Sequence, residues 1–135
     1  MEDTIIRLDP ALRVLVVDDC ADTRETLKLV LGLWGYTIET AKDGRAALGA
    51  AVSFRPDVVL LDLALPGMDG YEVARGLRRL PDLGTLPIVA LTGYASDEDR
   101  QRSEAEGLAG HLVKPADTDE IRRVILTAVR TAARV

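Results

Sequence analysis

The sequence contains a single cysteine, Cys20, among its 135 residues. One cysteine cannot form an internal disulfide, which favours a reducing compartment. The first ten residues also lack the basic start and the long apolar block of a secretion signal. We therefore expect the protein in the cytoplasm.

Long apolar runs and an excess of basic charge are missing as well. The longest apolar run, residues 29–36 (LVLGLWGY), is far shorter than the roughly 18 residues that a membrane-spanning helix requires. The 17 Lys and Arg residues are outnumbered by 22 Asp and Glu, which gives a net charge of −5. Because nucleic acids and anionic membranes attract basic surfaces, neither is an expected partner.

What the sequence does contain fits one globular domain. We expect a single domain over residues 1–135, with a core from about residue 13 to about residue 134. A chain of this length buries about 68–70% of its unfolded surface, which is enough for a hydrophobic core. The last helical pattern runs nearly to Val135, so we expect no separate output domain.

Short apolar runs alternate with amphipathic stretches along the chain. The runs occupy residues 14–17, 58–61, 88–91 and 112–113, and residues 36–41 (YTIETA) form a weaker, alternating strand that suits a sheet edge. Continuous apolar runs of this length are typical of strands buried on both faces, as in a parallel sheet.

Between the runs, apolar residues recur with the spacing of a helix. The stripes are Leu27, Val30, Leu31 and Trp34; Ala47, Ala51 and Phe54; Val73, Ala74, Leu77 and Leu80; and Ile121, Val124, Ile125, Ala128 and Ala132. Asp43, Asp69, Ser96 and Asp117 are placed to cap the starts of helices. Five strands alternating with five helices predict an α/β fold, in which a parallel sheet carries helices on both faces.

The fourth helical segment, residues 96–107 (SDEDRQRSEAEG), has almost no apolar stripe. Its acidic residues suit a helix N-terminus, and Ala105 is its one clear candidate for burial. Because a helix gains most of its stability from packing an apolar face, we expect this helix to be marginal and easily displaced.

Polar residues follow the central apolar runs at the point where each run ends. Asp18 and Asp19 follow the first run, Asp62 the third, Thr92 the fourth and Lys114 the fifth. In a parallel sheet all carboxyl ends lie on one edge, and ligands bind in the crevice there. We therefore expect these five side chains to converge.

The chemistry of this set indicates a divalent cation. Neighbouring carboxylates disfavour each other's ionisation unless a cation neutralises them, and Lys114 supplies only one positive charge. Mg²⁺ suits best, because it takes one or two carboxylates, keeps waters and accepts a phosphate oxygen. Each residue alone has a structural interpretation, since an Asp at a strand end often caps the next helix and a Thr or Lys there is usually solvated. It is their conjunction on one edge that predicts a site.

Four stretches, VLVVDD, DVVLLDLALPGMDG, PIVALTG and HLVKP, carry a resemblance to a known family. Over roughly residues 13–135 the chain resembles the receiver domain of two-component response regulators, with ALTGY and HLVKP most similar to receivers of hybrid sensor kinases. The resemblance implies a flavodoxin-like, doubly wound five-stranded parallel sheet of strand order 2-1-3-4-5 with five helices.

The resemblance also implies the metal ligands. Asp62 would be the phosphoacceptor, and Asp19 and Asp62 would bind Mg²⁺ directly. Asp18 would bind the ion through water, and the main-chain carbonyl of Ala64 would be a further ligand. The chain would catalyse only its own phosphorylation and dephosphorylation, and so would not be an enzyme in the usual sense.

The remaining positions would contact the phosphoryl group. Thr92 would hydrogen-bond it, Lys114 would pair with its charge, and the Lys114–Pro115 bond would be cis. The donor would be a phosphohistidine on a sensor histidine kinase or a histidine phosphotransfer protein. A downstream protein would then recognise a switched surface around the fourth helix, the fifth strand and the fifth helix.

The sequence departs from the family at the switch. The family usually has Tyr or Phe three residues before the Lys, where this chain has His111, and KPAD lacks the common Phe after the Pro. His111 either replaces the aromatic switch residue that works with Thr92, or is a partly exposed residue of an edge strand. In the family, side chains at the positions of Ala64 and Tyr94 flank the route of the water that attacks the phosphoryl group.

Three other functions remain open at this point. A haloacid-dehalogenase-like phosphatase also uses an Asp nucleophile, but it needs a second Asp where this chain has Cys20. A flavodoxin-like flavin binder needs a phosphate-binding loop after the first strand, and DDCAD would repel phosphate. An interaction module that never uses phosphate would have no need of the acidic set.

Overall fold

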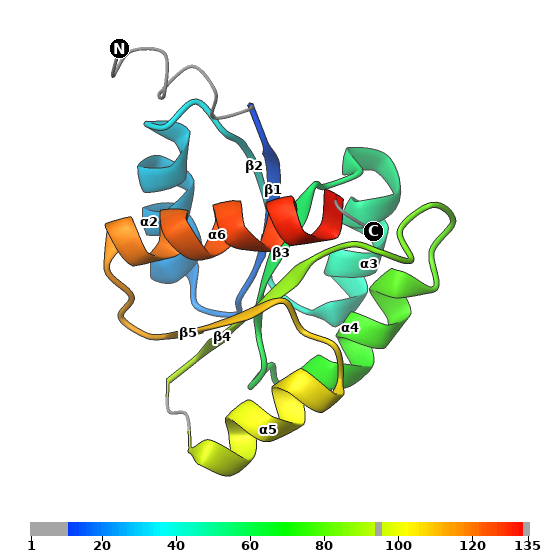
Figure 1. Cartoon of the computed structure of the whole chain (residues 1–135). Helices are drawn as coiled ribbons and strands as arrows, with labels where there is room; N and C mark the ends of the chain where they lie inside the picture. The colour runs from blue at the N-terminus through cyan, green and yellow to red at the C-terminus, as the bar shows by residue number, and fades with distance from the viewer. Residues whose placement is uncertain (1–10, 94–95, 134–135) are drawn as a thin grey trace.

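The computed structural model describes residues 11–93 and 96–133 (Figure 1). Its strands are β1 (Arg13–Val17), β2 (Thr37–Ala41), β3 (Val58–Asp62), β4 (Ile88–Thr92) and β5 (Gly110–Val113). They form one parallel sheet in the order β2-β1-β3-β4-β5, which confirms the predicted flavodoxin-like topology. The predicted runs differ from the observed strands by one or two residues at their ends.

Within residues 11–93 and 96–133, five helices alternate with the strands, as predicted. They are α2 (Ala21–Gly32), α3 (Gly44–Phe54), α4 (Gly70–Arg78), α5 (Asp97–Ala105) and α6 (Thr118–Ala133). Helices α2 and α6 cover one face of the sheet, and α3 and α4 cover the other (Figure 1). Across the described ranges 11–93 and 96–133, no helix has the length and apolarity needed to cross a membrane.

The sheet divides the interior into two hydrophobic cores. In β1, Val14 and Val16 belong to the core under α2 and α6, while Leu15 and Val17 belong to the core under α3 and α4. This alternation is the period of two along a strand. Because helices cover both faces, every residue of β3 is buried, which accounts for its continuous apolar run.

The predicted caps mark the starts of the helices. The side chain of Asp43 accepts a hydrogen bond from the amide of Ala46, that of Asp69 from the amide of Tyr71, and that of Asp117 from the amide of Asp119. Ser96 begins α5 with a complete capping box, in which the side chain of Asp99 also accepts from the Ser96 amide.

Two helices end earlier than their apolar stripes. Helix α2 ends at Gly32, so Trp34 lies in the following turn, where it packs edge-to-face against Tyr36 with ring centroids 5.9 Å apart. The turn passes through Gly35, whose φ of +86° is in the left-handed region that favours glycine. Helix α4 ends at Arg78, so Leu80 packs on the core from beyond the helix.

Helix α5 has the weak apolar face that its sequence predicts, but Ala105 is not its buried residue. Ala105 is exposed, whereas Ser103 retains only 3% of its surface and is the buried residue of α5. The hydroxyl of Ser103 lies 3.1 Å from the hydroxyl of Tyr71 on α4. A buried hydroxyl is tolerated where it has such a partner, which an apolar stripe cannot reveal.

Candidate functional site

Three carboxylates meet at the carboxyl end of the sheet. Asp18 follows β1 and is fully buried, Asp62 ends β3 and is 4% exposed, and Asp19 is exposed. One carboxylate oxygen of each lies within 4.8 Å of the other two. Since β1 and β3 are neighbours in register, with Val17 beside Leu61, the residues that follow them must meet. The predicted convergence of these carboxylates is confirmed.

Lys114 joins this cluster from the end of β5. Its Nζ lies 2.6 Å from Asp18 Oδ2 and 3.2 Å from Asp62 Oδ2. The Lys114 amide donates to the Thr92 carbonyl at 2.7 Å, which fixes the start of the loop, and the following bond to Pro115 is cis. Burial lowers the pKa of Lys114, but its contacts with the two carboxylates outweigh this effect, so the pKa is raised above its ordinary value.

Main-chain amides hold the two buried carboxylates in place. Asp18 Oδ1 accepts from the amide of Cys20 at 2.9 Å, and Asp62 Oδ1 accepts from the amide of Ala64 at 2.9 Å. Arg24, in the first turn of α2, donates from Nη1 to the main-chain oxygen of Asp18 at 2.9 Å. Sequence reasoning missed Arg24, although a cation in the first turn of a helix, where the helix dipole disfavours it, was a usable signal.

Thr92 and His111 lie around a neighbouring cavity of about 260 Å³, whose other lining residues include Ala64, Tyr71 and Arg102. His111 is half-buried, and neither of its ring nitrogens has a hydrogen-bond partner among residues 11–93 and 96–133. Burial lowers the pKa of His111, the charge of Arg100 lowers it further, and Asp99 acts in the opposite direction.

The loop after β3 brings the main chain of Ala64 to the edge of the cluster. Ala64 is exposed, and its amide is the donor to Asp62 described above. The loop folds back tightly, because a Cβ on Gly70 would lie 2.6 Å from the Cα of Leu63. Tyr94, the other residue predicted to flank the phosphoryl group, lies outside the described residues.

Cys20 is an exposed residue beside the cluster and fills no space in the interior. It occupies the N-cap position of α2. A hydrogen bond from the Thr23 side chain lowers the pKa of the Cys20 thiol, and the amides of Thr23 and Asp22 lower it further. The thiol is therefore accessible and favours its thiolate form more than an ordinary cysteine.

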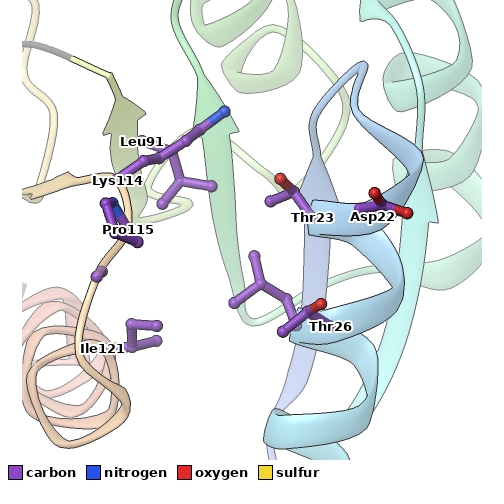
Figure 2. A pocket seen from close by; sticks show the side chains of 9 residues that line it. Asp22, Thr23, Thr26, Leu91, Lys114, Pro115 and Ile121 are labelled. Atoms are coloured by element: carbon purple, nitrogen blue, oxygen red, sulfur yellow. The ribbon is translucent and has the colours of Figure 1, made fainter.

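A second cavity, of about 410 Å³, opens beside Lys114 (Figure 2). One wall comes from the start of α2, with Asp22, Thr23 and Thr26, and the other from the loop that leads into α6, with Lys114 and Pro115. Leu27, Leu91, Ala116 and Ile121 give it an apolar lining. The sequence did not indicate this cavity, because its walls come from segments about 90 residues apart.

The comparison with protein families agrees with this architecture. The family model described as the response regulator receiver domain matches residues 14–126. The chain belongs to the response regulator receiver family. The match extends from β1 into α6 and includes Asp18, Asp19 and Asp62.

Individual relatives show the same affiliation. The receiver domain is 43% identical over 110 residues to the response regulator MprA of Mycolicibacterium vanbaalenii, which corresponds to 82% of this chain and 47% of MprA. It is 39% identical over 112 residues to a 14.6 kDa protein of Leptolyngbya boryana, covering 83% of this chain and 86% of that protein. The chain thus spans about half the length of MprA but most of the Leptolyngbya protein.

Among solved structures, the chemotaxis protein CheY4 of Vibrio cholerae has a similar fold. It superposes with a TM-score of 0.83 at 34% sequence identity, over 88% of this chain and 99% of CheY4. At this identity the likeness extends beyond the fold to the sequence. The family model, the relatives and this solved structure all indicate a signalling domain of two-component systems.

Proposed function

We propose that this receiver domain, as one unit over residues 1–135, accepts a phosphoryl group on Asp62 from a phosphohistidine. The observation that supports this most directly is the position of Asp62 Oδ2, 3.2 Å from Lys114 Nζ and beside two further carboxylates. A carboxylate and a phosphoryl group are both negatively charged and repel each other. A positive charge beside the carboxylate offsets this repulsion and lowers the barrier to phosphoryl transfer. The donor is a sensor histidine kinase or a histidine phosphotransfer protein.

The residues at this edge fit a Mg²⁺ ion. The donor atoms are all oxygens, and three carboxylates share the single ammonium of Lys114. Asp19 and Asp62 would bind the ion directly, Asp18 through water, and the carbonyl of Ala64 would complete the protein ligands. When bound, the ion neutralises charge on the oxygens of the transferring phosphoryl group.

The chain's own residues position and neutralise the reacting groups. A carboxylate oxygen of Asp62 forms a bond to phosphorus while the bond from phosphorus to the donor imidazole nitrogen breaks, and its electron pair returns to the imidazole. The amide of Ala64 holds the orientation of the Asp62 carboxylate. Lys114 pairs with the negative oxygens, and the Thr92 hydroxyl donates to one of them.

Hydrolysis of the resulting acyl phosphate ends the signal at the same site. Ala64 is exposed and offers no acid or amide side chain to orient water. Tyr94 lies outside the described residues, and in the family the side chain at its position flanks the other side of the phosphoryl group. The chain therefore catalyses only its own phosphorylation and dephosphorylation. Tyr94→Ala should change the decay rate of the phosphorylated protein, and an unchanged decay curve would remove Tyr94 from this role.

The phosphodonor docks against α2, where the apolar cavity beside Lys114 lies between α2 and the loop into α6 (Figure 2). Leu29 of α2 and Leu33, the C-cap of α2, are 68% and 79% exposed and follow Thr26 at the spacing of three and seven residues that favours one side of a helix. Exposed leucines next to an apolar cavity are suited to the side of a partner helix. Docking there brings a donor histidine within reach of Asp62.

The output is a protein-interaction surface around α5, β5 and α6 that a downstream protein recognises. The net charge of −5 supports a protein target and disfavours direct binding to nucleic acid or to anionic membrane. We place this exchange of phosphoryl groups in the cytoplasm.

A small-molecule phosphodonor tests the proposal. The protein is incubated with acetyl phosphate and Mg²⁺, and intact mass is followed with and without a chelator. Asp62→Asn should abolish the mass increase, while Asp82→Asn, at an exposed position, should not. Labelling of Asp62→Asn, or labelling that persists in chelator, would refute Asp62 as the Mg²⁺-dependent acceptor. A parent protein that acquires no label would instead favour an interaction module that does not use phosphate.

A further inference from the structure

Helix α5 is attached to the domain without apolar packing. In the part of the chain that the structure describes, neither hydrophobic core includes a side chain of α5. Its buried residue, Ser103, is polar. The helix lies beside α4 at one end of the molecule (Figure 1), and side chains of α5 contact Tyr71 of α4.

Tyr71 of α4 is at the centre of these contacts. Its hydroxyl lies 3.1 Å from the Ser103 hydroxyl, and both residues are more than nine-tenths buried. The guanidinium of Arg102 lies over the Tyr71 ring, 4.2 Å from its centroid, and 3.4 Å from the Asp69 carboxylate. One aromatic side chain is thus held on its edge by a hydroxyl of α5 and on its face by a cation of α5.

The C-terminal end of α5 is held in a similar manner. Arg75 Nε lies 3.4 Å from the Glu106 carboxylate. Arg78 donates from Nη1 to the Glu106 carbonyl at 3.1 Å and from Nη2 to the Gly107 carbonyl at 2.6 Å. Gly107 has a φ of +79°, which ends the helix and directs its carbonyl toward Arg78.

We propose that a polar latch across α4 holds α5 on the domain, with the paired hydroxyls of Tyr71 and Ser103 at its centre. The latch comprises Asp69, Tyr71, Arg75 and Arg78 on the α4 side and Arg102, Ser103, Glu106 and Gly107 on the α5 side. Water can replace each of these polar partners when the latch opens, and the Tyr71 ring is the apolar surface that opening would expose. Helix α5 therefore opens without disturbing either core.

The latch also forms a wall of the cavity that contains Thr92 and His111. Asp69, Tyr71 and Arg102 line this cavity. A rearrangement of Thr92 or His111 would consequently change the surroundings of the latch directly. The attachment of α5 itself does not depend on phosphoryl transfer, so the latch is open to test in the unphosphorylated chain.

Amide hydrogen exchange of residues 97–107 measures the opening of the latch. Tyr71→Phe removes one hydroxyl and leaves the ring in place, so exchange in α5 should become about five-fold faster, the effect of losing one hydrogen bond. Exchange in β1 and β3 should stay as in the parent protein. Tyr36→Phe, a change in the core on the other face of the sheet, is the matched control and should leave α5 unchanged.

A double-mutant cycle separates the latch from general loss of stability. Ser103→Ala alone should also speed exchange in α5, and the double variant with Tyr71→Phe should add little, because the two hydroxyls act as one pair. Fully additive effects would overturn the pairing. If Tyr71→Phe does not fold, Ser103→Ala still tests the latch through the difference in exchange between α5 and the strands.

Salt and charge provide an independent measurement. Raising NaCl from 0.05 to 0.5 M should speed exchange in α5 of the parent protein, since partly exposed ion pairs are screened. Arg102→Gln should speed it at low salt and reduce the salt dependence, while Arg123→Gln on the exposed face of α6 should do neither. Exchange in α5 that is unaffected by salt and by Arg102→Gln, or that rises only together with exchange in β1 and β3, would refute the latch.

Discussion

Asp18 and Asp62 present their carboxylates to Lys114 in the same way, although they follow different strands. In each residue Oδ1 accepts from the amide two positions later, and Oδ2 points to the Lys114 ammonium. Main-chain amides in the two turns therefore hold both carboxylates in their orientation. A single ammonium then balances two buried charges, which leaves the cluster short of positive charge.

Removing the Lys114 ammonium should therefore destabilise the metal-free protein. Lys114→Gln leaves two adjacent buried carboxylates without their cation, and the free energy of unfolding should fall by about 2–3 kcal/mol, less than for a fully buried pair because Lys114 is partly exposed. Added Mg²⁺ should restore part of this loss. Urea denaturation with and without Mg²⁺ measures both effects, with the exposed Lys42→Gln as control. Equal stability of the two variants would contradict the shared-cation arrangement.

The sole histidine, His111, should make the stability of the fold depend on pH in a defined direction. Because the pKa of His111 is lowered on folding, the unfolded chain binds a proton first as pH falls. The contribution of His111 to the stability of the fold is present above about pH 6.5, the ordinary pKa of histidine, and is lost as the pH falls from there toward the lowered pKa. The ring proton resonances of His111 should titrate with a midpoint below 6.5 in the folded protein. A midpoint at or above that value would contradict this.

The same titration should affect the response of α5 to a phosphoryl mimic. With beryllofluoride bound, the amide shifts of α5 should change less at pH 5.5 than at pH 7.5, because a protonated His111 resists burial beside Thr92. His111→Phe should remove this pH dependence and leave phosphorylation intact. Equal responses at both pH values would make His111 a residue of the edge strand with no part in switching.

Arg24 is expected to act as a positioning residue for the metal ligands. It holds the main chain at Asp18, so Arg24→Ala should weaken Mn²⁺ binding roughly tenfold, the effect of losing a group that orients a ligand. Mn²⁺ titration followed by electron paramagnetic resonance measures the affinity directly. Lys28→Ala, one turn further along α2 and exposed, should bind Mn²⁺ as the parent does. A loss of melting temperature without a loss of affinity would leave Arg24 with only a structural role.

Cys20 should be the most convenient chemical reporter of this edge. Its exposed thiol and lowered pKa predict that iodoacetamide reacts at pH 7.5 faster than with the same chain unfolded in urea. Thr23→Val removes the largest cause of the shift and should slow the reaction. The rate as a function of pH, followed by mass, gives the pKa in each variant. A rate that Thr23→Val does not alter would exclude this hydrogen bond as the cause.

Most of the fold could be predicted because each strand carries its own signal. The runs ending at Val17, Leu61 and Leu91 are continuous, and a parallel sheet covered on both faces is the arrangement that buries such strands completely. Once the strands were placed, their carboxyl ends had to share an edge. That placed Asp18, Asp62 and Lys114 together without further information.

The rest could not be predicted, because it depends on contacts that leave no periodic pattern. The partners Tyr71 and Ser103 are 32 residues apart, and Ser103 belongs to a helix whose sequence has almost no apolar stripe to mark a buried face. Ala105 was expected to be buried because it is the one apolar candidate in this helix. The helix instead buries the face that carries Ser103, whose hydroxyl pairs with Tyr71. The hydrogen bond of Arg24 goes to a main-chain oxygen, which leaves no pattern in the sequence, so its unfavourable place in the first turn of a helix was the signal that could have indicated it.

The exclusion of α5 from both cores has a consequence for how such a domain diversifies. Substitutions on the outward side of α5 alter no packed side chain, so they cost the fold little and are free to follow the demands of a new binding partner. The polar latch toward α4 keeps the helix in place while its exposed residues change. Variant libraries confined to the exposed positions of α5 should therefore yield folded proteins with retargeted partners at a much higher frequency than libraries of equal size in α3 or α4.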